Sequence, residues 1–546
     1  MPAAMVSSIP SMPLETSPRG TGLRWAAALG IGLATAAVYT GTLGDPLIYD
    51  DHVWITRNPA IRHLSPLMGV LHPAAGALVS GRPILSLSLA LNYAISGNAP
   101  WSYHLANIAI HILAALALFG IVSRSLALRP EAFPRESDRI LPAFAVALLW
   151  AVHPLQTESV TYVIQRAESL MGLFYFLTLY CFIRGVQSGR PVAWHFLAVA
   201  ACLLGMATKE VMVTAPLIVL AYDRAFVAGT FRRALRLRGG LYLGLAATWI
   251  IPVLLSAGLG RRGVGFGLGY SWWAYSLTEG WVVAHYILLA AWPYPLVLDY
   301  GIGIVGSVGD TVPWVIAILM IGAIAFDAFW RRSLLGFAGV WFFLVLAPSS
   351  SVVPVAFQPM ADHRMYLPLA AVVAVFVGAF WELLGRLSLP LFLGLALVLG
   401  AGTVLRNRDY RTETSIWDDT VLRRPSNPRA RIALGTALAD EGKLAEAAEQ
   451  FVAALRIDPG DFEARRSLGL VLYRMGRYSD ALAQYGRLLP PKPDQAPFHH
   501  DVALALEAAG RNREAIGEYA RALALDPGDT EARARLERLK ALPAAR

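Results

Sequence analysis

The sequence predicts an all-α protein in which a polytopic bundle of transmembrane helices is followed by an α-solenoid of helical repeats. Of the 546 residues, 56% are hydrophobic and only 16% are charged, with a mean hydropathy of +0.50. A soluble domain usually carries about 25% charged residues. Apolar runs of membrane-spanning length recur along the chain. From about Asn427 the composition changes to Ala, Glu, Arg and Leu, and a repeat begins.

Eleven apolar segments are candidates for transmembrane helices, because each is bounded by charge, Pro or Gly. They lie at about 25–44, 103–123, 140–154, 169–184, 192–208, 211–222, 240–258, 312–330, 334–348, 366–384 and 389–405. A further segment, 274–292, contains Glu279 and His285 and is rich in Trp and Tyr. That composition favours an interfacial or re-entrant helix over a full crossing.

Arginine clusters orient the predicted membrane domain, residues 25–406. Loops rich in Arg stay in the cytoplasm, so the N-terminal tail, residues 1–24, is predicted to be cytoplasmic. Arg331 and Arg332 fall on that same side only if 274–292 does not cross singly. The segments predicted to lie outside are then 45–102, 155–168, 259–311, 349–365 and everything after residue 406.

The repeat has a period of 34 residues. Three sets of positions keep this spacing: Pro459, Pro493 and Pro527; Ala447, Ala481 and Ala515; Phe451, Tyr485 and Tyr519. Small residues where two helices touch, with Pro closing each unit, are the tetratricopeptide signature. We predict a tetratricopeptide domain over residues 427–546, with about three repeats and a capping helix, and we expect it to bind protein.

Several classes of function are disfavoured. The net charge of +9 comes largely from Arg at helix ends, where topology already requires it, so nucleic-acid binding is not expected. Cys181 and Cys202 sit in apolar segments and form neither a disulfide framework nor a metal motif. No phosphate-binding Walker loop, dinucleotide fingerprint or nucleophile elbow occurs.

Unusual polar residues gather on the predicted outer side, which indicates an outward-facing site at the bilayer surface. They are Asp50, Asp51, Arg82, His104, His153, Glu158, Arg166, Glu168, Lys209, Glu210, Asp299, Asp362, His363 and Arg364.

Each of these groups can have a structural role instead of a chemical one. Asp50 and Asp51 either cap an interfacial helix or act as a base and its neighbour, because mutual repulsion raises one pKa. Arg166 and Arg364 either anchor at the interface or bind phosphate in bidentate fashion. The stretch from His153 to Glu168 can be a plain polar loop, and Lys209–Glu210 a neutralising ion pair.

A carboxylate pair with several cations suits the transfer of a sugar from a lipid phosphate to a hydroxyl. That reaction needs a base to take the acceptor proton and cations to stabilise the departing phosphate. The phosphate is already a good leaving group, so no general acid is required.

The chain resembles the transmembrane-and-tetratricopeptide protein O-mannosyltransferases, within the membrane-spanning C-type glycosyltransferases. The resemblance rests on "YDDHVWITRNPAI", "GRPILSLSLALNYAISGNAPWSYHLANIAIHIL", "HPLQTESVTYVIQRAESL", "ATKE", "LDYG", "DHRMYLPLA" and the repeats, in this order. It covers nearly the whole chain after residue 25.

The resemblance implies a dolichyl or polyprenyl phosphate sugar donor, usually of mannose, and inversion at the anomeric carbon. It assigns Asp50 and Asp51 to the acidic motif of the first outer loop, as base and acceptor ligand, and it implies no divalent metal. Arg166 and Arg364 are our choices for the donor phosphate, with Arg82, His153, Glu158, Lys209 and Glu210 as further substrate-binding candidates. Asp362–His363 departs from the family pattern, so roles there stay open.

We therefore expect a multi-pass enzyme of a bacterial inner membrane, with a periplasmic repeat domain that docks a protein acceptor. The lack of any N-x-Ser/Thr sequon is compatible with a bacterial source. Three alternatives stay open: transfer of another lipid-linked sugar to lipid or glycan, a transporter with a repeat adaptor, and a membrane-tethered scaffold. A transporter would favour inverted repeats and polar groups near the midplane, and a scaffold would leave the acidic pair replaceable.

Overall fold

A computed structural model describes residues 18–71, 81–255, 271–304, 308–350, 358–488 and 495–541. Most of the tail predicted for residues 1–24, and parts of the loops 45–102, 259–311 and 349–365, lie outside these ranges. The chain separates into two units: residues 1–298 with 302–412 form a membrane unit, and 299–301 with 413–546 form a repeat unit.

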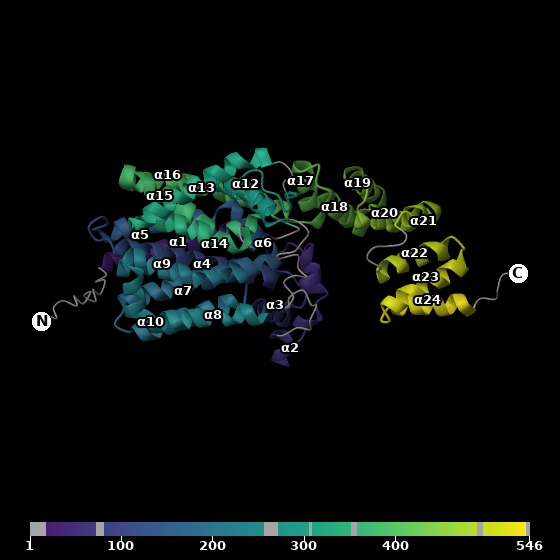
Figure 1. Ribbon diagram of the computed structural model, residues 1–546, viewed down its shortest axis with the longest axis horizontal. Helices are drawn as coiled ribbons and strands as arrows, with labels where there is room; N and C mark the ends of the chain where they lie inside the picture. The colour runs from purple at the N-terminus through teal and green to yellow at the C-terminus, as the bar shows by residue number, and fades with distance from the viewer. Residues whose placement is uncertain are drawn as a thin grey trace. The chain divides into compact units, whose positions relative to one another are not determined.

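The membrane unit is a bundle of helices that run side by side (Figure 1). Its long helices are α1 (Pro18–Tyr39), α4 (Trp101–Ala127), α5 (Glu136–Ala151), α7 (Arg166–Gln187), α8 (Pro191–Met206), α10 (Phe231–Ala247), α12 (Trp272–Ala291), α13 (Val308–Trp330), α14 (Leu334–Ser350), α15 (Pro368–Leu384) and α16 (Leu389–Asp409). Shorter helices are α2 (Leu67–Leu71), α3 (Pro83–Ser96), α6 (Thr157–Thr161), α9 (Ala215–Tyr222) and α11 (Ile250–Leu255). At the centre α4 packs against α5 and α7, and α7 packs against α8.

Every predicted span coincides with helix in the described chain. Seven helices there are long and apolar enough to cross a membrane, or eight if the bent pair Glu136–Ala151 and Pro154–Thr161 is one span. One of the seven, Pro368–Asp409, combines two of the predicted segments; the chain breaks inside it at Gly385, whose φ is 56°. The segments expected at 192–208 and 334–348 form shorter apolar helices. Both cysteines are buried and free, as expected.

The arginine-rich loops meet at one end of the membrane unit, which we call the arginine end. Contacts between distant loops place them together: Arg24 with Glu136 at 3.1 Å, Arg386 with Asp138 at 2.9 Å, Arg129 with the carbonyl of Arg332 at 2.7 Å, and Arg224 with the carbonyl of Phe329 at 2.7 Å. Arg332 therefore lies with the other predicted cytoplasmic loops, as the topology with a non-crossing 274–292 segment requires.

Helix α12 lies at the opposite end of the unit. Near its start, the Tyr275 hydroxyl donates to the carbonyl of Ser349, at the far end of α14. Near its end, the carbonyl of Ala290 is 3.1 Å from Nε2 of His153, which follows the last residues of α5. Both α14 and α5 begin at the arginine end, so both ends of α12 lie away from it. Helix α12 thus supports the interfacial prediction for 274–292, and it is not among the candidate spans.

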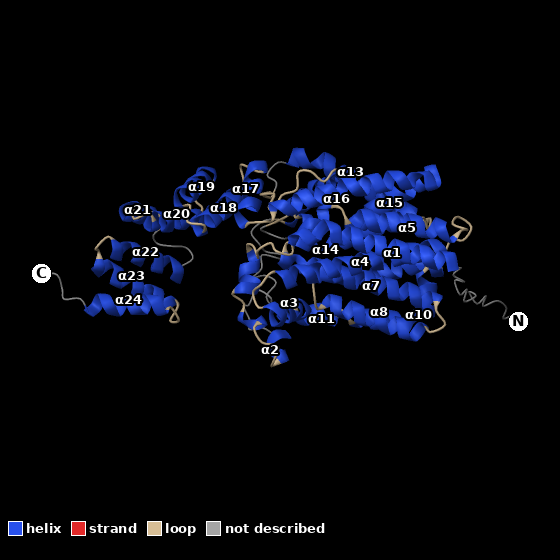
Figure 2. Cartoon of the chain, turned by 180° about the vertical axis from the view of Figure 1, so that it is seen from behind, coloured by secondary structure: helices blue, strands red, loops and turns tan. Residues whose placement is uncertain are grey.

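The repeat unit is built from helix pairs. Its helices are α17 (Glu413–Arg423), α18 (Pro428–Asp440), α19 (Leu444–Ile457), α20 (Phe462–Arg474), α21 (Tyr478–Gly486), α22 (Ala496–Ala508), α23 (Asn512–Leu525) and α24 (Thr530–Ala541). Each helix packs on the next, and Figure 2 shows helices and loops but no strand in the described parts of the chain. The all-α prediction, with helical repeats after a membrane bundle, is confirmed.

Close approach of the two helices in a repeat depends on Gly at fixed positions. A Cβ atom added at Gly435 would lie 2.8 Å from the ring of Phe451, and one at Gly469 would lie 2.4 Å from the ring of Tyr485. Both rings are buried. The 34-residue spacing of Gly and aromatic residues therefore reflects a contact that leaves no room for a larger side chain.

We predict that Gly469→Ala destabilises the second repeat by about 1–3 kcal/mol, the usual cost of overpacking a core. Limited proteolysis of the whole protein should then cut between α20 and α21 faster than in the wild type. Gly517→Ala is the matched control, because an added Cβ there meets nothing within 4 Å. Equal protection of the two variants would contradict the packing argument.

Candidate functional site

Asp51 binds the beginning of α7 from the loop that follows α1. Its Oδ1 accepts a hydrogen bond of 2.8 Å from the backbone N–H of Ile164, and its Oδ2 accepts one of 3.2 Å from Ile48. Ile164 lies in the short turn Val163–Gln165, directly before α7. The side chain is 1% exposed. Asp51 is thus a cap, although of a helix start 113 residues away rather than of its own segment.

The pKa of Asp51 follows from this burial. Desolvation raises the pKa of its carboxyl to about 8, and the backbone N–H groups of Ile48 and Ile164 oppose part of the rise. The neighbouring charge of Asp50 raises it further. Both oxygens of Asp51 are already engaged by backbone N–H groups, so neither is directed at a substrate hydroxyl.

Asp50 has a different environment. Its side chain is half-buried, and its backbone N–H donates to the hydroxyl of Tyr162 at 3.1 Å. The residue before it, Tyr49, has a φ of 48°, which is uncommon for a side chain of this size. The chain therefore turns sharply so that Asp51 points into the protein while its neighbour stays accessible.

The acidic pair lies at the end opposite the arginine end, which we call the acidic end. Thr161, close to the turn that Asp51 caps, donates to Asn407 at 2.7 Å. Thr403, one turn earlier in α16, donates to the carbonyl of Val152 at 2.7 Å. Helix α16 therefore finishes at the acidic end, and the chain leaves the membrane unit there before α17 begins.

Glu158 and His363 form a buried pair at the acidic end. The carboxylate accepts from His363 twice, at 2.8 Å from Nδ1 and at 2.9 Å from the backbone N–H. Arg406 also acts on the charge of Glu158, and it pairs with Asp409 at 3.0 Å. The sequence placed Glu158 and His363 in a common site, but Arg406 looked like an ordinary residue at the end of a span.

Arg166 is enclosed by neutral acceptors. Its Nε donates to Asn107 at 2.6 Å, Nη1 to Asn92 at 2.5 Å, and Nη2 to the carbonyl of Tyr103 at 2.8 Å. A further bond reaches the carbonyl of Ser88. The side chain is 1% exposed. This geometry joins α3, α4 and α7 and gives no support to the expected contact with a donor phosphate, because the guanidinium faces the protein on every side.

Arg364 belongs to a second buried group of charges. It donates to two backbone carbonyls in the preceding loop and to Ser350, and it interacts electrostatically with Glu279 of α12 and Glu168 of α7. Glu168 in turn pairs with Lys209. Burial raises the pKa of Glu279 to about 7, and Arg364 opposes the rise. In the sequence Glu279 served only to argue that 274–292 does not cross the membrane. Its interaction with Arg364 could not be seen there, because the two residues are 85 positions apart.

The remaining candidates have partners outside the two buried groups of charges. Arg82 pairs with Glu210 at 3.1 Å and is partly exposed. His153 and His104 are buried, each with a ring nitrogen 3.1 Å from a backbone carbonyl. Asp362 is buried, and Asp299 belongs to the repeat unit, where it pairs with Arg429 at 2.7 Å. No group of three or more His, Cys, Asp or Glu residues that could hold a metal occurs in the part of the chain that the structure describes.

We predict that Arg166→Lys lowers thermal stability, since an ammonium group cannot reach three separate acceptors and a lost buried hydrogen bond costs about 1–3 kcal/mol. The measurement is the melting temperature of the purified protein in detergent. Arg82→Lys, at the same end but partly exposed, should melt close to the wild type. Wild-type melting of Arg166→Lys together with weaker binding of a lipid-phosphate donor would restore the phosphate role.

Comparisons with known proteins agree with this architecture. A family model described as Tetratricopeptide repeat matches residues 414–462, 432–497 and 466–530. A Caenorhabditis elegans protein named Protein O-mannosyl-transferase F38B6.6 is 23% identical over 454 residues, which are 77% of this chain and 61% of the relative. Drosophila melanogaster Protein O-mannosyl-transferase Tmtc3 is 26% identical over 515 residues, covering 79% and 55%. Mus musculus Protein O-mannosyl-transferase TMTC2 is 33% identical over 201 residues, covering 34% and 22%.

The chain thus spans less than two thirds of the length of these relatives. Similarity to proteins of one shared name runs through most of the chain, and the repeat model matches its C-terminal part. These findings confirm the resemblance to the transmembrane-and-tetratricopeptide protein O-mannosyltransferases that the sequence motifs indicate.

Proposed function

We propose that this protein is a membrane glycosyltransferase that moves a sugar, mannose in our proposal, from a polyprenyl-phosphate donor to a hydroxyl group of a protein acceptor. The relatives' name, protein O-mannosyl-transferase, supports the reaction class. The single observation that carries the proposal for this chain is the acidic pair, in which one carboxyl is bound into the helix start and its neighbour is left accessible.

The two carboxylates then have different roles. Asp51 is a positioning residue, because both of its oxygens accept backbone hydrogen bonds. Asp50 is the base. Its side chain is half-buried beside Tyr162, so it lies at the surface of the acidic end, where a substrate can reach it.

The proposed reaction is a single displacement at the anomeric carbon. Asp50 takes the proton of the acceptor hydroxyl while the hydroxyl oxygen forms a bond to the anomeric carbon. The bond from that carbon to the phosphate oxygen breaks, and the lipid phosphate leaves with the electron pair. One displacement inverts the anomeric centre, so α- and β-linked products distinguish it from a two-step route.

Arg82 and Lys209 are our proposal for the cations that meet the donor phosphate. Both are partly exposed, and both already pair with a glutamate, Glu210 and Glu168 respectively. A phosphate can replace or join such a carboxylate partner without moving the cation. Arg166 and Arg364, which bind backbone and amide oxygens, are assigned to hold the surrounding segments.

The repeat unit is proposed to dock the acceptor protein. A concave stack of tetratricopeptide units commonly holds an extended peptide, and tethering raises the local concentration of the acceptor. This helps only if the repeats and Asp50 share a compartment. Support comes from the membrane unit alone, since α16 finishes at the acidic end. We propose that this end faces the periplasm of a bacterial inner membrane.

We predict that Asp50→Asn reduces sugar transfer by about 10² to 10⁴ while the melting temperature stays near that of the wild type. The assay combines the purified protein with polyprenyl-phosphate mannose, other lipid-linked sugars and a panel of acceptors, and it detects glycosylated products by mass spectrometry. Asp51→Asn should lower the melting temperature as well as the rate, because an amide nitrogen cannot accept from a backbone N–H.

Asp45→Asn is the matched control, since Asp45 lies at the start of the same loop and has no assigned role in the reaction. Normal transfer by Asp50→Asn would remove the base assignment. Loss of transfer without loss of stability in Asp51→Asn would exchange the two roles. Transfer of another sugar in preference to mannose would change the proposed donor sugar but leave Asp50 assigned as the base.

A further prediction concerns sidedness. Arg513, on α23, and Arg331, at the arginine end, are both exposed, and both native cysteines are buried. In intact spheroplasts a membrane-impermeant maleimide should label Arg513→Cys, and it should label Arg331→Cys only after lysis. The reverse pattern would place the repeats and the acidic end in the cytoplasm and would contradict acceptor docking outside.

A further inference from the structure

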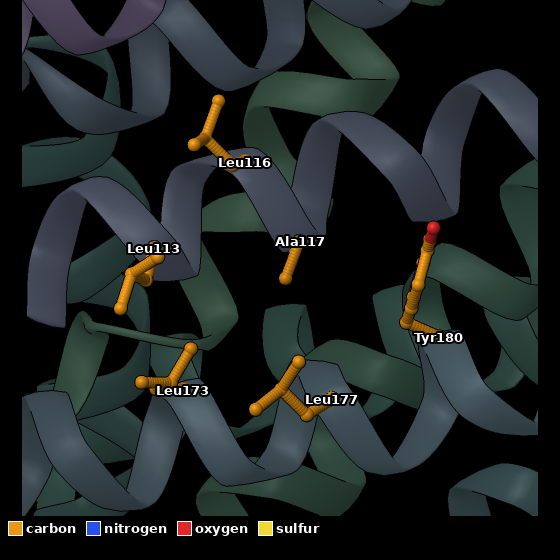
Figure 3. A pocket seen from close by; sticks show the side chains of 6 residues that line it. All are labelled: Leu113, Leu116, Ala117, Leu173, Leu177 and Tyr180. Carbon is orange, nitrogen blue, oxygen red and sulfur yellow. The ribbon is translucent and has the colours of Figure 1, made fainter. Parts of the chain in front are cut away.

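A groove runs between α4 and α7 on the surface of the membrane unit. Leu113, Leu116 and Ala117 line it from α4, and Leu173, Leu177 and Tyr180 line it from α7; it has a volume of about 270 Å³ (Figure 3). Leu113 is more than half exposed. Five of these six side chains are purely aliphatic, so the groove accepts hydrocarbon and offers nothing to a polar ligand.

Two arginines meet at the Tyr180 end of this groove. The guanidinium carbon of Arg124 is 5.6 Å from the centre of the Tyr180 ring, and that of Arg184 is 5.9 Å from the same ring. Arg184 also donates to the Tyr180 hydroxyl at 3.1 Å, and Arg124 donates to Gln187 at 3.0 Å. Two positive charges are therefore held around one aromatic side chain.

Neither arginine has a carboxylate partner among the ion pairs of the described residues. The contrast is with Arg24, at the same end of the unit, which pairs with Glu136 at 3.1 Å. Arg24 and Arg184 both add positive charge beside Arg124. Like charges held together cost free energy unless an anion lies between them. The pair is accordingly a site for an anion that the chain does not supply.

The distance along the groove fits one leaflet. Leu113 and Arg124 are eleven residues apart on α4, which is about 16 Å at 1.5 Å per residue. Half of the hydrocarbon core of a bilayer is roughly 15 Å. Leu113 thus lies near the depth of the midplane when Arg124 lies at the arginine-end surface, where the phosphate groups of lipids are found.

We propose that this groove binds an anionic membrane phospholipid of the leaflet at the arginine end. Its acyl chain lies between α4 and α7, and its phosphate lies between Arg124 and Arg184. Basic pockets between transmembrane helices at the cytoplasmic side are a known form of headgroup recognition. The site lies at the end of the unit remote from Asp50, and it is independent of the proposed sugar transfer.

The test is the melting temperature of the whole protein in detergent, with phosphatidylglycerol or phosphatidylcholine of the same acyl chains added. Phosphatidylglycerol should raise the melting temperature of the wild type by roughly 2 °C or more above phosphatidylcholine. The double variant Arg124→Gln/Arg184→Gln should lose this difference. Leu177→Trp, which fills the groove, should lose it also. Arg190→Gln, an exposed arginine at the same end, should keep it.

Three results would overturn the proposal. Equal shifts with the two lipids would mean that the arginines anchor the helices and recognise no headgroup. A shift retained in the double variant would place the anion elsewhere. A shift with polyprenyl phosphate but not with phosphatidylglycerol would assign the groove to a prenyl chain. Should the double variant not fold, Leu177→Trp decides: loss of the phosphatidylglycerol shift supports the groove, and its retention refutes it.

Discussion

The contact between Asp51 and the start of α7 is the interaction on which the acidic end depends. The first N–H groups of a helix have no partner within the helix, and a carboxylate nearby stabilises that end. Asp51 satisfies one of them at Ile164 and also closes its own loop at Ile48. The strained φ of Tyr49 is tolerated because the chain is fixed on both sides of it. The accessibility of Asp50 follows from that fixed turn.

The acidic end buries several charged side chains, among them Glu158, Glu168 and Arg364. Three of the buried charges are paired or hydrogen-bonded: Glu158 binds His363, Glu168 binds Lys209, and Arg364 binds backbone carbonyls. In a medium of low dielectric constant such groups hold position strongly, because separating them is costly. Preorganised dipoles and charges of this kind suit the proposed reaction, in which negative charge moves from the base to the departing phosphate.

The fold could be predicted from the sequence because the patterns that indicate it are local. Apolar runs and a 34-residue period are read from neighbouring residues, and both correspond to helices in the structure. Both ends of α12 lie away from the arginine end, which agrees with the prediction of a non-crossing segment made from Glu279 and His285.

The site was harder to predict from the sequence, because the residues that contact one another there are far apart along the chain. Asp51 and Ile164 are 113 residues apart, so the sequence could name capping as one reading of the acidic pair but could not name the helix. Arg166 was interpreted as an interfacial anchor or a phosphate ligand, whereas its charge is enclosed by Asn92 and Asn107 of other helices. Only packing distinguishes an arginine that binds substrate from one that joins three helices.

The predicted interfacial position of α12 also bears on membrane thickness. The chain exposes Trp272 and Trp273 where α12 begins, and Trp292 and Tyr294 just after it ends; such aromatic side chains prefer the headgroup region of one leaflet. A lipid-linked phosphate lies in that same region. The acidic end and the phosphate of the proposed lipid-linked donor then lie at a single water–lipid boundary. Bilayers of different thickness would change the tilt of the spanning helices while leaving the depth of the acidic end relative to that boundary the same.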